Sequence, residues 1–265
     1  MKKPITLIKI GGSLITDKNK PFTVQQRALE IIADEVSKAS KLGKPIIIGH
    51  GAGSFAHVPA KKYQTHRGIF NQQSYRGIAE VADVAAQLNR IVIKKLLEKK
   101  VNAVSVSPLS SMTATDFDLD QVFTQPIELI LENDLLPVVY GDQIMDREKG
   151  CTIFSTERVL GYLGLALQGN GYQIEQIIQC GQTNGVYDAN GDTIPEINSQ
   201  NFSAYKEALG GSGGVDVTGG MLHKVEETLE LAKQGIPGLI IDGIVHGTLS
   251  DAIAGKPVLG TRIVN

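Results

Sequence analysis

The residues best suited to chemistry lie near the start of the chain, where a lysine stands close to the end of an apolar run and two glycines follow. Residues 5–10 have the pattern of a short β-strand, and Lys9 is the charged residue within that run. Gly11, Gly12 and Ser13 come next. A strand that delivers an ammonium group to a glycine turn, whose backbone N–H groups can face an anion, suits phosphate chemistry.

A second apolar run, residues 45–48, leads into a second glycine-rich stretch, GHGAGSFAH, at residues 49–57. In open α/β sheets, ligands collect beyond the carboxyl ends of the strands, and glycine lets the backbone approach them closely. Neither glycine stretch matches the P-loop or the dinucleotide-binding fingerprint. For either stretch taken alone, the alternative is that its glycines only make a tight turn between a strand and a helix.

The composition describes an ordinary globular protein. The chain has 265 residues, of which 42% are hydrophobic and 20% are charged, so it can bury a substantial core. The net charge of -2, without a basic run, argues against a broad surface for nucleic acid or anionic lipid. No signal-peptide pattern and no apolar run of membrane-spanning length is present, so we expect a cytoplasmic location without membrane contact. Cys151 and Cys180 lack the spacing of a disulfide framework or a zinc site, and we predict no metal ligand among the side chains.

Strand-like and helical patterns alternate along the chain. The helical patterns cover residues 24–42, 74–100, 127–131, 156–167 and 221–234. The strand patterns cover residues 46–48, 101–106, 136–140, 176–180, 238–243 and 260–264, and residues 150–154 are compatible with a hairpin. This alternation favours an α/β fold with a mainly parallel sheet covered by helices on both faces.

Several motifs together resemble those of the amino acid kinase superfamily and, within it, of the isopentenyl phosphate kinases. The matching segments are IKIGGSLIT at residues 8–16, GHGAGSFAH at 49–57, LNRIV at 88–92, SVSP at 105–108, YGD at 140–142 and DVTGGM at 216–221. They run through nearly the whole chain in the order found in the family. This collinearity makes the resemblance more specific than any single motif does.

The resemblance implies a single amino acid kinase domain over residues 1–265, built as a three-layer αβα sandwich. Residues 1–170, approximately, would form the lobe that binds the acceptor, and residues 171–265 the lobe that binds ATP. The implied activity is ATP-dependent phosphorylation of isopentenyl phosphate to isopentenyl diphosphate. ATP with Mg²⁺ and an isoprenoid monophosphate would be the ligands, and the family is usually homodimeric.

Transfer of a γ-phosphoryl group depends mainly on positioning and positive charge. By resemblance, Lys9 would contact the transferring phosphoryl group, and Lys224 would neutralise charge on the β- or γ-phosphate. Lys18 is a further candidate for a phosphate contact, although Lys20 competes with it and a surface role is the alternative. The remaining expected ATP contacts are at Gly11, Gly12, Ser13, Thr183, Gly185, Tyr187, Gly219 and Gly220.

His57 distinguishes the subfamily, because the isopentenyl phosphate kinases carry a histidine at this place to hold the phosphate of the acceptor. An imidazole N–H there could donate a hydrogen bond to a terminal phosphate. Gly51, Ala52, Gly53 and Ser54 would form the rest of this phosphate site.

The hydrocarbon end of the acceptor needs an apolar wall. Ile78 and Val81, on the helix predicted over residues 74–100, could supply that wall. The alternative is that they belong to the ordinary core.

Three places leave alternatives open. Many relatives have SGDD where this chain has STER, so Glu157 is a candidate for organising the two lysines only if its loop is shifted. Asp142 could order the acceptor site, or it could simply cap a turn. The segment TNGVYD at residues 183–188 lacks the carboxylates of the relatives' TDVDGVY, which leaves the nucleotide preference open.

Two other functions remain as alternatives. One is a kinase of the same superfamily that acts on another small phosphate or on a phosphonate such as fosfomycin. The other is a nucleotide-binding relative without catalytic activity.

Overall fold

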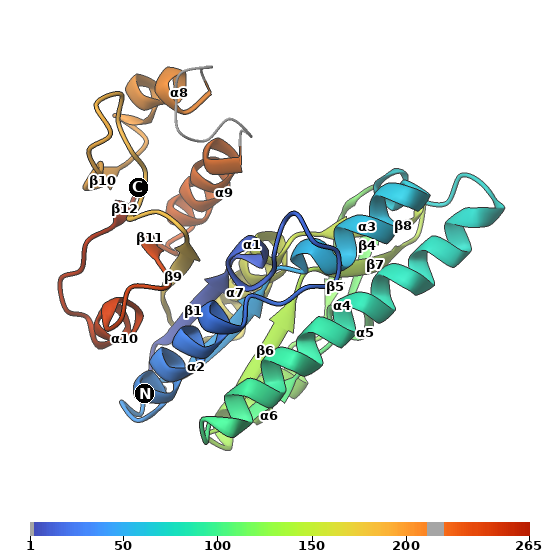
Figure 1. Ribbon diagram of the computed structural model, residues 1–265, viewed down its shortest axis with the longest axis horizontal. Coiled ribbons are helices and arrows are strands. Elements are labelled where there is room, and N and C mark those ends of the chain that lie inside the picture. The colour runs from blue at the N-terminus through green and yellow to red at the C-terminus, as the bar shows by residue number, and fades with distance from the viewer. Residues whose placement is uncertain (1–2, 211–219) are drawn as a thin grey trace.

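Eight strands form the central sheet. The structure, a computed structural model, describes residues 3–210 and 220–265. The strands of this sheet are β1 (Ile5–Ile10), β2 (Ile46–His50), β3 (Ala103–Ser105), β6 (Leu136–Tyr140), β9 (Ile174–Gly181), β10 (Glu196–Ile197), β11 (Gly238–Asp242) and β12 (Thr261–Ile263). Their spatial order is β10-β12-β11-β9-β1-β2-β6-β3 (Figure 1). Strand β1 pairs in parallel with both β2 and β9, so the carboxyl ends of the central strands meet at one edge.

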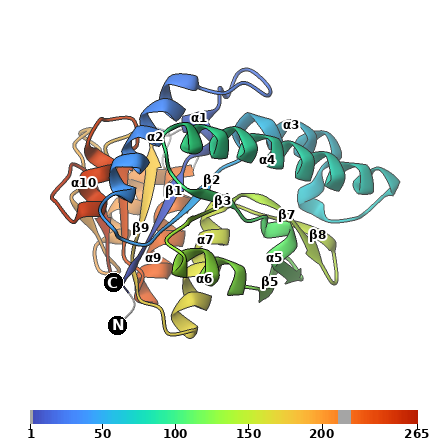
Figure 2. The same cartoon turned by 90° about the horizontal axis from the view of Figure 1, so that it is seen from below.

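Helices cover both faces of this sheet. Successive side chains of a strand point to opposite faces, and in the central strands most side chains on both faces are apolar. In β1, Ile8 and Ile10 pack into one core cluster, and Ile5 and Leu7 pack into another. The helices on the first face are α1 (Gly12–Ile15), α2 (Gln26–Ser40), α4 (Gln72–Glu98) and α10 (Thr248–Ala254). Those on the second face are α6 (Gln125–Glu132), α7 (Thr156–Gly169) and α9 (Gly220–Lys233), as Figure 2 shows. The three-layer αβα sandwich is therefore confirmed.

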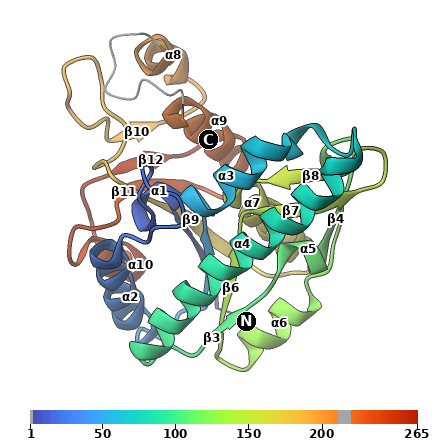
Figure 3. The ribbon, with the colours of Figure 1, turned by 45° about the vertical axis from the view of Figure 1, so that its right-hand side comes forward.

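A second, smaller sheet lies beside helices α3 (Gly53–Tyr63) and α4 (Figure 3). Its strands are β4 (Met112–Thr115), β5 (Asp118–Val122), β7 (Asp142–Asp146) and β8 (Gly150–Phe154), in the order β5-β4-β7-β8. Strands β7 and β8 pair antiparallel, which confirms the predicted hairpin. Strands β4 and β5 were not predicted. The remaining helical segments are η1 (Thr65–Arg67), α5 (Pro108–Ser111) and α8 (Phe202–Gly210).

The long helix α4 begins two residues before its predicted start, because a capping box fixes its first turn. The side chain of Asn71 accepts hydrogen bonds from the backbone N–H groups of Gln73 and Ser74, and Ser74 Oγ accepts from the backbone N–H of Asn71. The apolar stripe of the helix then packs on the sheet through residues such as Leu88 and Val92.

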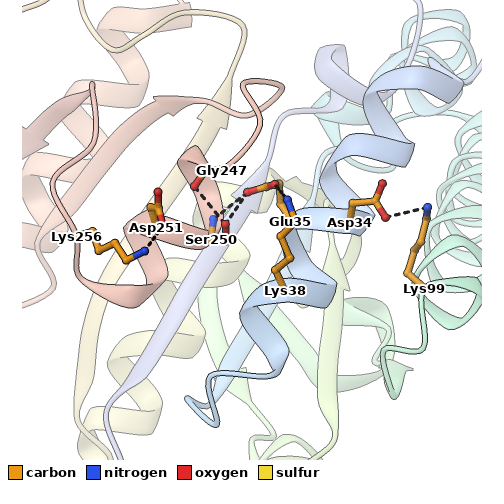
Figure 4. A network of polar contacts seen from close by, with 8 residues as sticks. All are labelled: Asp34, Glu35, Lys38, Lys99, Gly247, Ser250, Asp251 and Lys256. Carbon is orange, nitrogen blue, oxygen red and sulfur yellow. Dashed lines mark hydrogen bonds and ion pairs between the residues drawn. The ribbon is translucent and has the colours of Figure 1, made fainter.

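A buried carboxylate connects helix α2 to helix α10, the last helix of the chain (Figure 4). Glu35 of α2 is fully buried, and its Oε2 accepts hydrogen bonds from the backbone N–H and the hydroxyl of Ser250, at 3.2 and 2.8 Å. Ser250 lies in the first turn of α10, so Glu35 caps that helix from another element. Burial alone would raise the pKa of Glu35, but the ion pair with Lys38 and the hydrogen bonds from Gly247 and Ser250 hold the net pKa below its usual value.

The central sheet runs without interruption from β3 to β10. The residues expected to bind the acceptor and those expected to bind ATP therefore share one sheet, with β1 between them. Across residues 3–210 and 220–265, the helices are all too short or too polar to cross a membrane.

Candidate active site

The two glycine turns touch each other at the carboxyl edge of the sheet. A Cβ atom added to Gly12 would lie 2.6 Å from the backbone nitrogen of Gly53, and one added to Gly51 would lie 2.6 Å from the nitrogen of Gly12. No side chain larger than hydrogen fits at either position without a shift of the backbone. The hydroxyl of Thr16 links the turns, because it donates to the carbonyl of Gly12 at 2.8 Å and accepts from the N–H of Ser54 at 3.0 Å. If the glycines served only to make a tight turn in each loop, this contact between the two loops would not be explained.

The amide groups of the first turn differ in their availability. Gly12 and Ser13 occupy the first turn of α1, where backbone N–H groups have no partner within the helix. Gly11 departs from the expectation. Its N–H donates to the carbonyl of Cys180 at 3.0 Å, so this amide joins β1 to β9 instead of facing a phosphate.

Lys9 and Glu157 form an ion pair at the centre of this edge. The distance from Lys9 Nζ to Glu157 Oε1 is 2.6 Å, and Lys9 is 8% exposed although it belongs to the central strand β1. Glu157 lies in the first turn of α7, where the hydroxyl of Ser155 accepts the N–H of Arg158 as the helix cap. The longer side chain of Glu157 therefore reaches Lys9, as an organising carboxylate must.

Lys224 belongs to the same site as Lys9 and Glu157. Burial alone would raise the pKa of Glu157, but the charge and hydrogen bond of Lys9 hold the net pKa below its usual value, and the charge of Lys224 acts in the same direction. Lys224 projects from α9 toward the end of β9, since its Nζ lies 3.6 Å from the place where a Cβ on Gly181 would be. Burial raises the pKa of the nearby Cys180 thiol to about 12, although both lysines oppose that rise. Lys9, Glu157 and Lys224 therefore form one cluster.

Two residues that the sequence did not single out hold α9 in place. The side-chain amide of Gln179 on β9 donates to the hydroxyl of Thr228, and that hydroxyl donates to the backbone carbonyl of Lys224 at 2.6 Å. This chain of bonds ties the first turns of α9 to the central sheet. The signal in the sequence was weak, because Gln179 is one of several polar residues in β9, together with Glu175 and Gln176.

The expected nucleotide turn is ordered by its own hydrogen bonds. The hydroxyl of Thr183 donates to the carbonyl of Gly185 at 2.8 Å, and the hydroxyl of Tyr187 accepts from the N–H of Asn184 at 3.2 Å. Gly185 has a φ of 126°, a conformation that favours glycine. Gly220 is the first residue of α9, whereas Gly219 lies outside the described residues. Nucleotide contacts at this turn stay a prediction.

His57 is on a helix and not in a loop. It is the fifth residue of α3, and its exposed side chain lines a cavity of about 390 Å³ at the start of that helix. Lys18 lines the same cavity from the segment that follows α1, and Gly53 and Ser54 line it from the start of α3. The hydroxyl of Ser54 is buried and has no hydrogen-bond partner among the described residues, so it is free to bind a ligand.

The other expected acceptor residues differ in how they relate to this cavity. Gly51 and Ala52 form the turn before α3, beside its inner end. Val81 is 2% exposed and Ile78 is half-buried, both on α4, and neither is among the residues that line the cavity. Their role as a hydrocarbon wall stays a prediction.

Asp142 is buried at the start of β7. Its carboxylate accepts the backbone N–H of Gln143 at 2.8 Å, together with the N–H of Leu109 in the first turn of α5. Burial raises its pKa to about 7. This geometry favours the capping alternative, in which Asp142 supports the turn after β6 and does not contact the substrate.

A buried polar network, which sequence reasoning missed, positions the second glycine turn. His50 is fully buried at the end of β2, and burial lowers its pKa to about 4, so its ring is neutral. Its Nδ1 lies 3.2 Å from the carbonyl of Gly51, and its Nε2 lies 3.1 Å from the side-chain nitrogen of Asn89. The hydroxyl of Ser105 donates to Asn89 Oδ1 at 2.5 Å. One feature of the sequence indicated that Asn89 matters, namely its place in the segment LNRIV at residues 88–92, which resembles a motif of the family.

Comparison with known proteins agrees with this geometry. The sequence profile of the amino acid kinase family matches residues 4–242. An isopentenyl phosphate kinase of Methanothermobacter thermautotrophicus is 32% identical, with 97% of this chain and 98% of the relative covered. One of Methanocaldococcus jannaschii is 31% identical, with 98% of each chain covered. A crystal structure of an isopentenyl phosphate kinase superposes with a TM-score of 0.82 at 29% identity, over 98% of this chain and all of the other.

The chain therefore belongs to the amino acid kinase family. Within that family it groups with the isopentenyl phosphate kinases, which it matches along almost its whole length.

Proposed function

We propose that this protein transfers the γ-phosphoryl group of ATP to the phosphate of isopentenyl phosphate, which gives isopentenyl diphosphate and ADP. The observation that supports this most strongly is the place of His57. It faces a cavity that Lys18 also lines, beside the contact between the two glycine turns, in a chain similar to isopentenyl phosphate kinases.

The residues of the site divide into two groups on this proposal. His57 and the free hydroxyl of Ser54 bind the acceptor phosphate, and the first-turn amides of Gly12 and Ser13 face the phosphates of ATP. An acceptor oxygen attacks the γ-phosphorus, and the bond from that phosphorus to the β–γ bridging oxygen breaks. No proton transfer to a side chain is needed, because the attacking oxygen is already ionised.

The cluster of two lysines offsets the charge that develops during transfer. Lys9 and Lys224 come from β1 and α9 and meet at the carboxyl edge of the sheet. Glu157 holds the ammonium group of Lys9 in place before the substrates arrive, and its charge also attracts that of Lys224, so little reorganisation is needed in the transition state. Glu157 is a positioning residue on this proposal.

Mg²⁺ would enter with ATP. Within residues 3–210 and 220–265, no group of three His, Cys, Asp or Glu side chains could hold a metal ion. Mg²⁺ in kinase sites is commonly held by substrate phosphates and one or two carboxylates, which agrees with such a site. When bound, it neutralises phosphate charge. We also propose that the protein acts as a homodimer, as the family resemblance implies, and that it is located in the cytoplasm.

The decisive experiment measures ADP release with a panel of acceptors: isopentenyl phosphate, dimethylallyl phosphate, fosfomycin, glutamate and uridine monophosphate. We expect isopentenyl phosphate to give the highest kcat/KM. Preference for fosfomycin would support the phosphonate alternative, and no ADP release with any acceptor would support a binding role.

Substitution of His57 tests the acceptor site directly. We expect His57→Ala to lower kcat/KM for isopentenyl phosphate by about 100-fold, through loss of a charge-assisted contact near the reacting phosphate. The KM for ATP should change little. The matched control is His66→Ala, because His66 is also exposed but lies in η1, outside the cavity. Wild-type kinetics in the His57 variant would contradict the proposed site.

A further inference from the structure

One face of α3 lines the cavity over two turns of the helix. The residues that point toward it are Ser54, His57, Val58 and Lys61, which have the i, i+3, i+4, i+7 spacing of one helix face. The first two already belong to the proposed acceptor site. Lys61 extends the same face by one further turn, so the cavity has a second cationic residue that the sequence did not single out.

The opposite wall is held in a defined position. It consists of Lys18, Asn19 and Pro21, from the segment between α1 and α2. The backbone N–H of Asp17 donates to the carbonyl of Thr23 at 2.9 Å, which closes this segment into a loop. The ring of Phe22 then packs edge-on against the buried ring of Phe55 on α3, with 5.7 Å between the ring centroids. Lys18 and Lys61 therefore line the same cavity from two anchored elements.

Neither lysine has a carboxylate partner among the residues described by the structure. The neighbouring Lys62 differs, because it bonds to the hydroxyl of Tyr63 at 2.6 Å and pairs with Glu80 at 4.0 Å. Asp17, the acid next to Lys18, accepts the backbone N–H of Asn19. Two uncompensated ammonium groups and an imidazole around one cavity suit a ligand with more than one negative charge. The buried, unpartnered hydroxyl of Ser54 marks the inner end of that cavity as a ligand site.

Lys61 lies one helical turn after His57 on the same face of α3. The Cα–Cβ bond of a helical residue tilts toward the helix N-terminus, so the four-carbon stem of Lys61 can extend back over the turn that carries His57. A phosphate monoester carries close to two negative charges at neutral pH, whereas a carboxylate carries one. The ammonium group of Lys61 on the α3 wall therefore favours phosphate acceptors over carboxylates of similar size.

We propose that Lys61 is a further acceptor-binding residue, which contacts the phosphate of the acceptor from the α3 wall and makes the site selective for doubly charged acceptors. This inference rests on the proposed function. Lys61 lies one turn beyond His57, in a cavity that neither Lys9 nor Glu157 lines, so we expect its contact to be equally strong before and during phosphoryl transfer. Such a contact changes KM and leaves kcat nearly unchanged.

The test compares Lys61→Met with Lys62→Met, which removes an adjacent lysine that lies outside the cavity. For Lys61→Met we expect the KM for isopentenyl phosphate to rise about tenfold, while kcat and the KM for ATP stay within about twofold. Lys61→Arg should restore most of the affinity, and the difference from the wild type should shrink at high salt because the contact is exposed. Calorimetric titration of isopentenyl phosphate without ATP should show the same loss of affinity.

The outcomes separate this proposal from the proposed function. If the wild type phosphorylates isopentenyl phosphate and both methionine variants behave alike, Lys61 is a solvated surface residue and the inference is wrong. If Lys61→Met lowers kcat or the melting temperature and leaves KM unchanged, its role is structural, which also overturns the inference. If the wild type neither binds nor phosphorylates isopentenyl phosphate, the proposed function fails, and the selectivity assigned to Lys61 fails with it.

Discussion

Asp142 offers a quantitative test, because its carboxyl is buried and forms no ion pair with any residue that the structure describes. It is 3% exposed, and its two hydrogen bonds come from backbone N–H groups. Burial raises its pKa from 3.8 to about 7. The folded protein therefore binds a proton at this group between these two pH values, where the unfolded chain has already released it.

The sign of the effect follows from linkage. Because the folded-state pKa is raised, the stability that protonated Asp142 contributes is fully present below about pH 4 and is lost as the pH rises through about 7. One bound proton changes the free energy of unfolding by about 1.4 kcal/mol per pH unit, so this group costs about 2 kcal/mol between about pH 5.5 and about pH 8.5. Asp142→Asn removes this titration.

The measurement is urea-induced unfolding of the wild type and of Asp142→Asn at both pH values, analysed at a common m-value. We expect the variant to gain about 2 kcal/mol relative to the wild type on going from the lower to the higher pH. The amide keeps an oxygen that can accept the two N–H groups, although its own NH₂ needs a new partner and sets a constant offset. Asp34→Asn is the control, since Asp34 pairs with Lys99 at the surface. Parallel pH curves for the wild type and the Asp142 variant would show that the carboxyl is ionised in the folded protein.

Three further predictions follow from the site and the fold. Lys9→Ala and Lys224→Ala should each lower kcat by at least about 100-fold in steady-state assays, because both act on transition-state charge; substantial turnover in a folded variant would place that lysine outside the site. Lys9→Ala should also lower the melting temperature, because it leaves the carboxylate of Glu157 without its ion-pair partner. Glu35→Ala should lower the melting temperature by about 5 °C in a thermal scan, because the capped N-terminus of α10 loses its acceptors, whereas Asp34→Ala should have a much smaller effect. Ile78→Ala should raise kcat/KM for geranyl phosphate relative to isopentenyl phosphate if this side chain limits the hydrocarbon pocket, and an unchanged ratio would assign Ile78 to the core.

Most of the central sheet and its long helices could be predicted, because their residues follow the periods of buried strands and amphipathic helices. The predicted strand at residues 46–48 is extended to His50, and the predicted helix over 74–100 is α4. Strand β5 could not be predicted, since DLDQV is polar and mostly exposed. Its pairing with β4 depends on the small sheet that β7 and β8 complete. Short strands of this kind are stabilised by cross-strand partners distant in sequence, which no local pattern reveals.

The sequence by itself indicated a phosphate site and its family. Lys9 at a strand end and the two glycine turns suit phosphate chemistry, because such turns let backbone amides approach an anion. The resemblance to the isopentenyl phosphate kinases added the expected phosphoryl transfer and the role of His57. Only the tertiary structure decided which groups are free to act. In the folded protein, Lys9 is paired with Glu157, and the amide of Gly11 is hydrogen-bonded between two strands. Lys61 and His57 line the same cavity. The reason is that pairing and burial depend on residues far apart in the sequence, such as Gly11 and Cys180, which meet only when parallel strands bring their carboxyl ends to one edge.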